Sequence, residues 1–244
     1  MKRLIKLTKL STSSIEKNIV GVLTNKAVAY TKLPIFASEE LASIIGNAFG
    51  DGYVSNQKFK YVNKRKELVI KVKENMRNVF GVNGREFYIK NKKCYGIEFP
   101  GVVGKLLIMV GAPNGRKTIQ KTIIPAWIKR DDSGIKSNFL KTLFDDDGSV
   151  CLGKYQKFIT ISFYKNKSIV SNLIKFLNEL RELLKEKNVF ASKVLYKKDY
   201  KDTQEFGFRI YGFENLKNFY ENIGFDDYVK YQKLLMAIRS YNVN

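Results

Sequence analysis

The alternation of apolar and polar positions divides this chain into two runs of elements that follow the same order. Residues 39–49 and 135–147 each place apolar side chains at helical spacing, and each run leads into an Asp-Gly pair. After the first run the pattern predicts, in order, strands at 53–54, 59–62 and 68–73, a helix at 74–80, a hairpin at 86–90 and 94–99, a helix at 101–110 and a short helix at 124–128.

The second run repeats this order about 96 positions later. The pattern predicts strands at 149–152 and 158–163, a helix at 167–185, a long-looped hairpin at 189–197 and 205–213, and helices at 214–222 and 227–241. A period near 100 residues is too long for a solenoid, so we expect a duplicated domain related by a pseudo-two-fold axis. The expected organisation is an N-terminal arm (1–36, with one short helix at 14–24) and two halves (37–130 and 131–244).

The first Asp-Gly helix carries terminal signals and two bare positions. Ser38 is a good N-cap, and Gly52 is a residue type that ends helices. Gly46 and Gly50 lie a turn apart on one face, where they allow a second helix to approach closely. The alternative is that these glycines only weaken the helix, by about 1 kcal/mol each.

The matching helix is less suited to close contact, because Thr142 and Asp146 stand where the first helix has glycines. We therefore expect a looser contact from that side. If the two helices cross and end together, Asp51 and Asp147 come into proximity. A lone Asp-Gly is usually a turn or a helix cap, but two copies behind equivalent helices favour a shared site.

Two neighbouring carboxylates repel each other unless a cation lies between them. Hard divalent ions such as Mg²⁺ prefer oxygen ligands, which here are carboxylates, water and phosphate. Two such ions about 4 Å apart can activate water and stabilise the leaving oxygen in phosphodiester hydrolysis. The pair Asp51 and Asp147 therefore predicts a magnesium-dependent site.

Composition narrows the partner and the chemistry. The 244 residues carry 44 Lys+Arg against 23 Asp+Glu, a net charge of +21, which favours a polyanionic partner, most often nucleic acid. A lysine-rich solvated surface is the alternative. The chain has no histidine, which excludes His-based triads, His-metal nucleases and zinc fingers.

Cys94 and Cys151 are too few for a metal cluster or a disulfide framework, so we expect buried free thiols in a reducing, intracellular compartment. No apolar run approaches the roughly 20 residues needed to cross a bilayer, and the basic start is not followed by the apolar core of a secretory signal. We expect no membrane partner.

The two motifs resemble those of the LAGLIDADG homing endonuclease family, in its single-chain, two-motif form. The first ends in Gly50-Asp51-Gly52, and the second reads Phe139-Leu140 to Asp147-Gly148. Residues 124–129 (IPAWIK) resemble a segment found before the second motif in such proteins, and the resemblance covers residues 33–241. It implies an α+β fold of two αββαββα halves, joined at a two-helix interface, with two antiparallel sheets that straddle a DNA duplex.

The resemblance also implies roles for individual residues. Asp51 and Asp147 would be the metal-binding carboxylates, and the carbonyls of Gly50 and Asp146 additional ligands. Basic residues near the metals suggest three pocket lysines, which are Lys71 (on the predicted strand 68–73, aligned with Ser162), Lys129 and Lys230. For each lysine the alternative is an ordinary surface or phosphate-contacting side chain.

The predicted strands and their turns carry many residues suited to a DNA surface. A two-stranded ribbon can enter the major groove and read base edges with Arg, Lys, Gln and Asn, while other lysines neutralise phosphate. The candidates are Tyr53, Gln57, Lys58, Lys60, Lys64, Arg65, Lys71, Lys73, Arg85, Tyr88, Lys90, Lys92, Lys154, Gln156, Lys157, Ser162, Tyr164, Lys193, Lys197, Lys198, Lys201, Gln204 and Arg209.

The sequence thus predicts a monomeric, site-specific DNA endonuclease that cuts both strands of a long asymmetric target, because the two halves differ at most strand positions. One alternative is an intron RNA maturase on the same fold, which needs a basic surface but no intact metal site. Another is a DNA-binding regulator that has lost cleavage.

Overall fold

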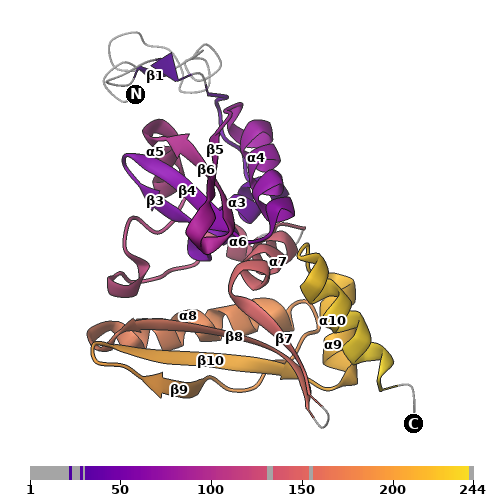
Figure 1. Ribbon diagram of the computed structural model, residues 1–244. Coiled ribbons are helices and arrows are strands. Elements are labelled where there is room, and N and C mark those ends of the chain that lie inside the picture. Colours follow the sequence, from indigo (N-terminus) through magenta and orange to yellow (C-terminus); the bar gives the residue numbers. More distant parts are fainter. Residues whose placement is uncertain (1–21, 24–27, 30, 131–133, 154–155, 242–244) are drawn as a thin grey trace.

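The computed structural model describes residues 22–23, 28–29, 31–130, 134–153 and 156–241. Over these residues it contains two four-stranded antiparallel sheets, one on either side of a central pair of helices, α3 (Glu39–Phe49) and α7 (Gly134–Asp147) (Figure 1). Ahead of them, two short strands pair antiparallel, β1 (Val22–Leu23) and β2 (Val28–Ala29). The predicted α+β class and the two-helix interface are confirmed.

The first half begins at Ser38, whose hydroxyl accepts a hydrogen bond from the Leu41 amide (3.2 Å), as predicted for an N-cap. The chain then continues through β3 (Tyr53–Ser55), β4 (Lys58–Asn63), α4 (Lys66–Phe80), β5 (Arg85–Ile89), β6 (Cys94–Pro100), α5 (Gly101–Met109) and α6 (Ala126–Arg130). The sheet order is β3-β4-β6-β5.

The second half follows α7 with β7 (Gly148–Leu152), β8 (Lys157–Asn166), α8 (Val170–Lys185), β9 (Leu195–Asp199), β10 (Thr203–Tyr211), α9 (Phe213–Asn222) and α10 (Tyr228–Arg239). Its sheet order, β7-β8-β10-β9, repeats that of the first half. Short 3₁₀ turns at Lys90–Lys92, Lys117–Ile119 and Lys167–Ile169 complete the structure. The duplication expected from the sequence is present in the order and pairing of the strands.

Three expectations about secondary structure are wrong. Residues 68–73 form the first part of α4 and no strand, because Leu68, Val69, Val72 and Met76 make one buried helical stripe that continues to Phe80. The strand predicted at 189–197 is shorter and later in the chain, since it is β9, and it joins β10 through a short turn and not through a long loop. The helix predicted at 14–24 falls largely outside the described residues, and its described part is β1.

The helix crossing is tight from both sides, which contradicts the looser contact expected of α7. A Cβ added at Gly46 would lie 2.9 Å from the Phe139 carbonyl oxygen, and one at Gly50 would lie 2.5 Å from Cβ of Asp146. Thr142 and Asp146 therefore fill the space that the glycines leave. Helix α3 ends two residues earlier than predicted, with Gly50 and not Gly52 as the C-cap.

Each sheet turns one face toward the helices and leaves the other face open. Val54, Phe59 and Tyr61 are buried on strands that contact α4 and α5, and Ile159 and Ile161 on a strand that contacts α7 and α8. The alternate positions along the same strands are mostly polar and more accessible, as expected for a half-buried antiparallel sheet. None of the helices in the described ranges is both long and apolar enough to cross a bilayer.

Candidate active site and nucleic-acid interface

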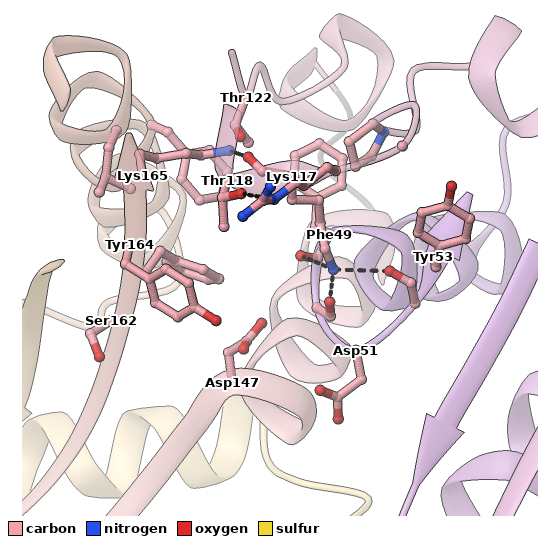
Figure 2. A pocket seen from close by; sticks show the side chains of 18 residues that line it. Phe49, Asp51, Tyr53, Lys117, Thr118, Thr122, Asp147, Ser162, Tyr164 and Lys165 are labelled. Carbon is pink, nitrogen blue, oxygen red and sulfur yellow. Dashed lines mark hydrogen bonds between the residues drawn. The ribbon is translucent and has the colours of Figure 1, made fainter. Parts of the chain in front are cut away.

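Asp51 and Asp147 line one pocket of about 480 Å³ at the C-terminal ends of α3 and α7. Figure 2 shows the two carboxylates beside each other, below the side chain of Lys117. The pocket is also lined by β8 and by the segment that links the halves, here called the strap (residues 113–122). The two Asp-Gly motifs therefore meet as the sequence predicts.

Lys117, on the strap, closes the end of α3. Its ammonium group donates hydrogen bonds to the carbonyl oxygens of Phe49 (3.1 Å) and Gly52 (2.9 Å), and to that of Gly50. The C-terminal end of a helix attracts cations, because its last carbonyls have no partner within the helix. Lys117 thus brings a positive charge to the edge of the two-acid pocket.

Lys230, on α10, does the same for α7. Its ammonium group donates to the carbonyl oxygens of Phe144 (3.0 Å) and Asp145. The Asp145 carboxylate in turn accepts hydrogen bonds from the amides of Asp226 and Asp227 (both 3.0 Å to Oδ1), which fixes the turn before α10. Each lysine follows the helix after its own sheet, α5 or α9, by eight residues, so the two halves complete equivalent helix ends with lysines at equivalent positions.

The pocket opposes the ionisation of its acids. Burial, followed by the negative charge of Asp51, raises the pKa of Asp147 to about 7, although Lys117 and Lys230 act in the opposite direction. Burial also raises the pKa of Asp51, against the pull of Lys117 and Lys230. Burial lowers the pKa of Lys117 itself. Two acids that are costly to ionise together would gain from a further cation between them.

This donor set suits a hard divalent ion that completes its shell with phosphate oxygens and water. The described residues contain no group of three or more His, Cys, Asp or Glu side chains placed to hold a metal ion by themselves. The Gly50 carbonyl, predicted as a ligand, is held by Lys117. At the end of α7, the Lys230 ammonium donates to the carbonyl oxygens of Phe144 and Asp145 and not to that of Asp146. The predicted role of the Asp146 carbonyl as a metal ligand therefore stays a prediction.

The Asp146 side chain points across the crossing into the first half. Its Oδ1 accepts from the Tyr61 hydroxyl (2.5 Å), and its Oδ2 accepts from the Asp51 amide (3.1 Å) and from Nδ2 of Asn47 (3.2 Å). Burial and the charge of Asp51 raise the pKa of Asp146 well above its usual value. The side chain therefore serves as a hydrogen-bond acceptor for the end of α3.

The strap is anchored to the second half. The Lys165 ammonium donates to the carbonyl oxygens of Lys117 and Gln120 (2.9 Å to the latter), and burial lowers its pKa to about 8. Asn172 on α8 exchanges two hydrogen bonds with the backbone of Thr122 (2.6 and 3.0 Å). A residue that completes the first half's helix is thus positioned by side chains of the second half.

Of the three predicted pocket lysines, Lys230 is the one whose charge acts on both acids, although its side chain does not line their pocket. Lys71 is on α4 and pairs with Asp226. Lys129 pairs with Glu179 on α8 (3.5 Å). Neither lines the pocket that holds Asp51 and Asp147. Ser162, which was aligned with Lys71, is on β8 and donates to Glu205 (2.7 Å).

Lys117 was missed, because it follows the loop 111–115 and belongs to no periodic segment. The only signal was a pair of basic residues, Arg116 and Lys117, directly after that Gly-rich loop. Tyr61 and Asn63 were also missed, since a tyrosine and an asparagine on a strand have many roles and only the fold brings them to Asp51.

The open face of the first sheet carries part of the predicted DNA surface. Strand register places Tyr53, Lys58, Lys60 and Arg85 on this face. Lys58 pairs with Glu98 (3.3 Å), and the ammonium of Lys60 lies 4.8 Å from the Phe87 ring centroid.

Other candidates from the first half lie elsewhere. Lys71 and Lys73 are on α4, behind the sheet, and Tyr88 faces the α4 side. Arg65 precedes α4 and pairs with Asp227 (3.4 Å). Gln57, Lys64, Lys90 and Lys92 lie in turns.

The open face of the second sheet has a comparable arrangement. Register places Ser162, Tyr164 and Arg209 on it, and Lys197 reaches across to the Thr160 hydroxyl (2.9 Å). Arg209 stacks on Phe158, with its guanidinium carbon 4.5 Å from the ring centroid. Lys198 pairs opposite Glu205 on the same face, Gln204 points to the other face, and Gln156, Lys157, Lys193 and Lys201 lie at strand ends or in turns. Lys154 is outside the described residues.

Comparison with known families agrees with the two motifs. Residues 134–224, which run from the start of α7 to just past α9, match the model of a family described as the LAGLIDADG-like domain. The second half of this chain is a LAGLIDADG-like domain. The first half repeats its order of elements and its sheet order, so the chain has a two-motif architecture.

Solved structures share the LAGLIDADG fold. Full-length DUF199/WhiA from Thermatoga maritima matches with a TM-score of 0.53 and 15% identity, over 87% of this chain and 64% of that one. The homing endonuclease I-LtrWI, solved bound to its target DNA, matches with a TM-score of 0.51 and 12% identity, over 84% of this chain and 91% of that one. At these identities the likeness establishes the fold alone.

Curated relatives are archaeal proteins named tRNA-splicing ligase RtcB. The match to the one from Methanocaldococcus jannaschii is 27% identical over an alignment of 237 residues, and it covers 86% of this chain and 24% of the ligase. The match to the one from Pyrococcus furiosus is 28% identical over an alignment of 207 residues, and it covers 76% of this chain and 21% of the ligase. The chain therefore spans about a quarter of the length of the curated relatives it matches.

Proposed function

We propose that this chain is a site-specific endonuclease of the LAGLIDADG type that cuts double-stranded DNA. The reaction requires a divalent metal ion, which we propose to be Mg²⁺. The observation that carries the proposal is the meeting of Asp51 and Asp147 in one pocket, at the ends of two crossed helices. The net charge of +21 and the open, basic sheet faces on both sides of this pocket support a duplex as the substrate.

In this proposal Asp51 and Asp147 hold the metal through carboxylate oxygens. The ion, when bound, supplies the charge that activates water and stabilises the leaving oxygen. Lys117 and Lys230 place ammonium groups at the ends of both helices, where they offset the negative charge of the scissile phosphates. Tyr53, Lys60, Tyr164 and Arg209 on the open sheet faces hold the flanking duplex, and the unlike faces favour an asymmetric target.

A DNA-binding protein without cleavage is the second candidate, and one observation favours it. The ammonium of Lys117 bonds the Gly50 carbonyl, an oxygen that would otherwise be free for a metal ion. If this contact persists on DNA, the lysine stands in for a cation and the chain binds without cutting. The same fold and the same basic faces serve both candidates.

One experiment separates them. A library of duplexes with randomised cores is incubated with the protein and Mg²⁺, and new ends are recovered and sequenced, with EDTA as the first control. The proposal predicts one family of cut sites that disappears with EDTA and with the Asp51→Asn/Asp147→Asn double variant. Retention of selected duplexes without any new ends would favour the binding protein, and cutting by the double variant would reject the site.

A further inference from the structure

The two acids of the pocket have unlike surroundings. Around Asp51, hydrogen bonds form a closed ring: Asp146 accepts from the Asp51 amide and from the Tyr61 hydroxyl, and Asn63 donates to the Tyr61 oxygen (3.2 Å) and to Oδ2 of Asp51 (2.9 Å). This ring, called here the Asp51 brace, fixes both the backbone and the carboxylate of Asp51.

The second half has no equivalent ring among the residues that the structure describes there (134–153 and 156–241). Strand pairing in the two sheets aligns Tyr61 with Ile161 and Asn63 with Phe163, and helix alignment sets Asp146 against Gly50. These counterparts are apolar or lack a side chain, so they cannot hold Asp147 by hydrogen bonds. Asp147 is surrounded by the strap, β8 and the two lysines.

We propose that Tyr61, Asn63 and Asp146 are positioning residues that pre-orient Asp51, so that the two acids contribute unequally to metal binding and the two DNA strands are cut with unequal dependence on the brace. The inference rests on the proposed nuclease function. Its physical basis is that a ligand fixed by outer hydrogen bonds loses less freedom when it binds a cation than one without them.

The brace also crosses between the halves, because Asp146 belongs to α7 and its partners belong to α3 and β4. It is therefore a feature of the helix crossing and of Asp51 at once. Removing the Tyr61 hydroxyl leaves the crossing intact but opens the ring at Asp146 Oδ1. Removing the Asn63 amide releases the Asp51 carboxylate and leaves its backbone bond to Asp146 in place.

The test uses Asn63→Ala and Tyr61→Phe, with two matched controls that remove the same groups elsewhere. Asn222→Ala deletes an amide that donates to the Lys187 carbonyl (3.1 Å), and Tyr220→Phe deletes a hydroxyl that pairs with Tyr231 (3.0 Å). Thermal unfolding of each variant establishes that it is folded.

The first readout needs no DNA. Free Mn²⁺ is counted by its electron paramagnetic resonance signal while the protein is titrated with Mn²⁺ alone. We expect Asn63→Ala to weaken binding about 10- to 100-fold, as the loss of an outer hydrogen bond to a metal ligand does. Tyr61→Phe should have a smaller effect, and the controls should match the parent protein. Equal Mn²⁺ affinity in the parent and Asn63→Ala overturns the proposal, even if the parent cuts no DNA.

The second readout resolves the strands. A supercoiled plasmid that carries a selected target is followed through its nicked and linear forms, and end-labelled duplexes identify the strand cut. The proposal predicts that Asn63→Ala slows one strand far more than the other, so that nicked DNA accumulates. Equal slowing of both strands, or no slowing, contradicts it. Absence of cutting by the parent would instead count against the nuclease function.

Discussion

Asp51 and Asp147 end equivalent helices in halves of the same topology, yet different physics holds each one. Asp51 belongs to a ring of hydrogen bonds in which Asn63 donates to its carboxylate and to Tyr61, and Asp146 accepts from Tyr61 and from the Asp51 amide. Asp147 has its pKa raised to about 7 by burial and by the charge of Asp51. The duplicated backbone therefore preserves the position of each acid, whereas the side chains around the two acids differ.

The lysines show the opposite of this divergence. Lys117 on the strap and Lys230 on α10 both donate to the last carbonyls of a motif helix. Each follows the helix after its sheet, α5 or α9, by eight residues. The duplication therefore kept a lysine at the end of each motif helix, although the surroundings of the two acids differ.

The largest effect is expected from removing either lysine. If the chain is the proposed nuclease, Lys117→Met and Lys230→Met should each reduce cleavage of a selected target by about 10²-fold or more, because each deletes a positive charge that would face the scissile phosphates. Single-turnover cleavage under excess enzyme measures the loss. Lys129→Met, which removes an ammonium paired with Glu179 outside the pocket, is the matched control and should cut at the parent rate. Parent-level cutting by both pocket variants would contradict the assignment.

The helix crossing can be broken and then repaired. Gly50→Ala should destabilise the fold by about 1–3 kcal/mol, because its Cβ would meet Cβ of Asp146 at 2.5 Å. In the Asp146→Gly background the same change should cost less, since the opposing side chain is gone. Denaturant unfolding of the four proteins gives the coupling free energy. Additive effects would show that the two positions are not in contact.

Lys165, which anchors the strap, can be compared with the more accessible Lys129 on α6. Lys165→Gln should lower the free energy of unfolding by about 1–3 kcal/mol, because the carbonyls of Lys117 and Gln120 lose their buried donor. Lys129→Gln, at a half-buried ion pair, should cost less than about 1 kcal/mol. Both variants carry the same chemical change, so denaturant unfolding compares the two sites directly. Equal costs would mean that the strap is not anchored through Lys165.

A further expected effect is a pH dependence that belongs to Asp147. Its folded pKa of about 7 is above the ordinary value of 3.8, so the folded state binds more protons than the unfolded state between these values. Its contribution to stability is therefore present below pH 4 and is lost as the pH rises through 7. In metal-free buffer, Asp147→Asn should stabilise the protein at pH 8 relative to the parent, but not at pH 4. Thermal unfolding at both pH values tests this, and an equal difference at the two values would refute the shift.

Much of the frame was predictable from the sequence. The N-cap at Ser38, the end of α7 at Asp147 and the matching strand order of the two halves all depend on local patterns, and the structure confirms them, whereas α3 ends at Phe49 and not at Gly52. Residues 68–73 were misassigned because six residues of apolar and basic alternation looked like a strand, while the buried stripe becomes clear only over the 15 residues of α4. A short alternating pattern can therefore hide a longer helical one.

The chemistry around the acids could not be predicted to the same extent. Lys117 reaches the site because Lys165 and Asn172 hold the strap against the second half, a long-range arrangement with no periodic signature. The sequence predicts that Asp146 loosens the helix crossing, whereas its carboxylate accepts a hydrogen bond from Tyr61, which lies on a strand 85 positions earlier in the chain. Side chains that meet through tertiary structure alone leave no pattern in a single sequence.

The most direct test of the central claim compares Asp51→Asn with Asp147→Asn on one selected duplex, with Mg²⁺ and a strand-resolved readout. If the two acids form one metal-dependent centre, each single variant should lose double-strand cleavage while its affinity for the duplex in Ca²⁺ stays close to that of the parent. Double-strand cleavage at the parent rate by either variant would contradict the account.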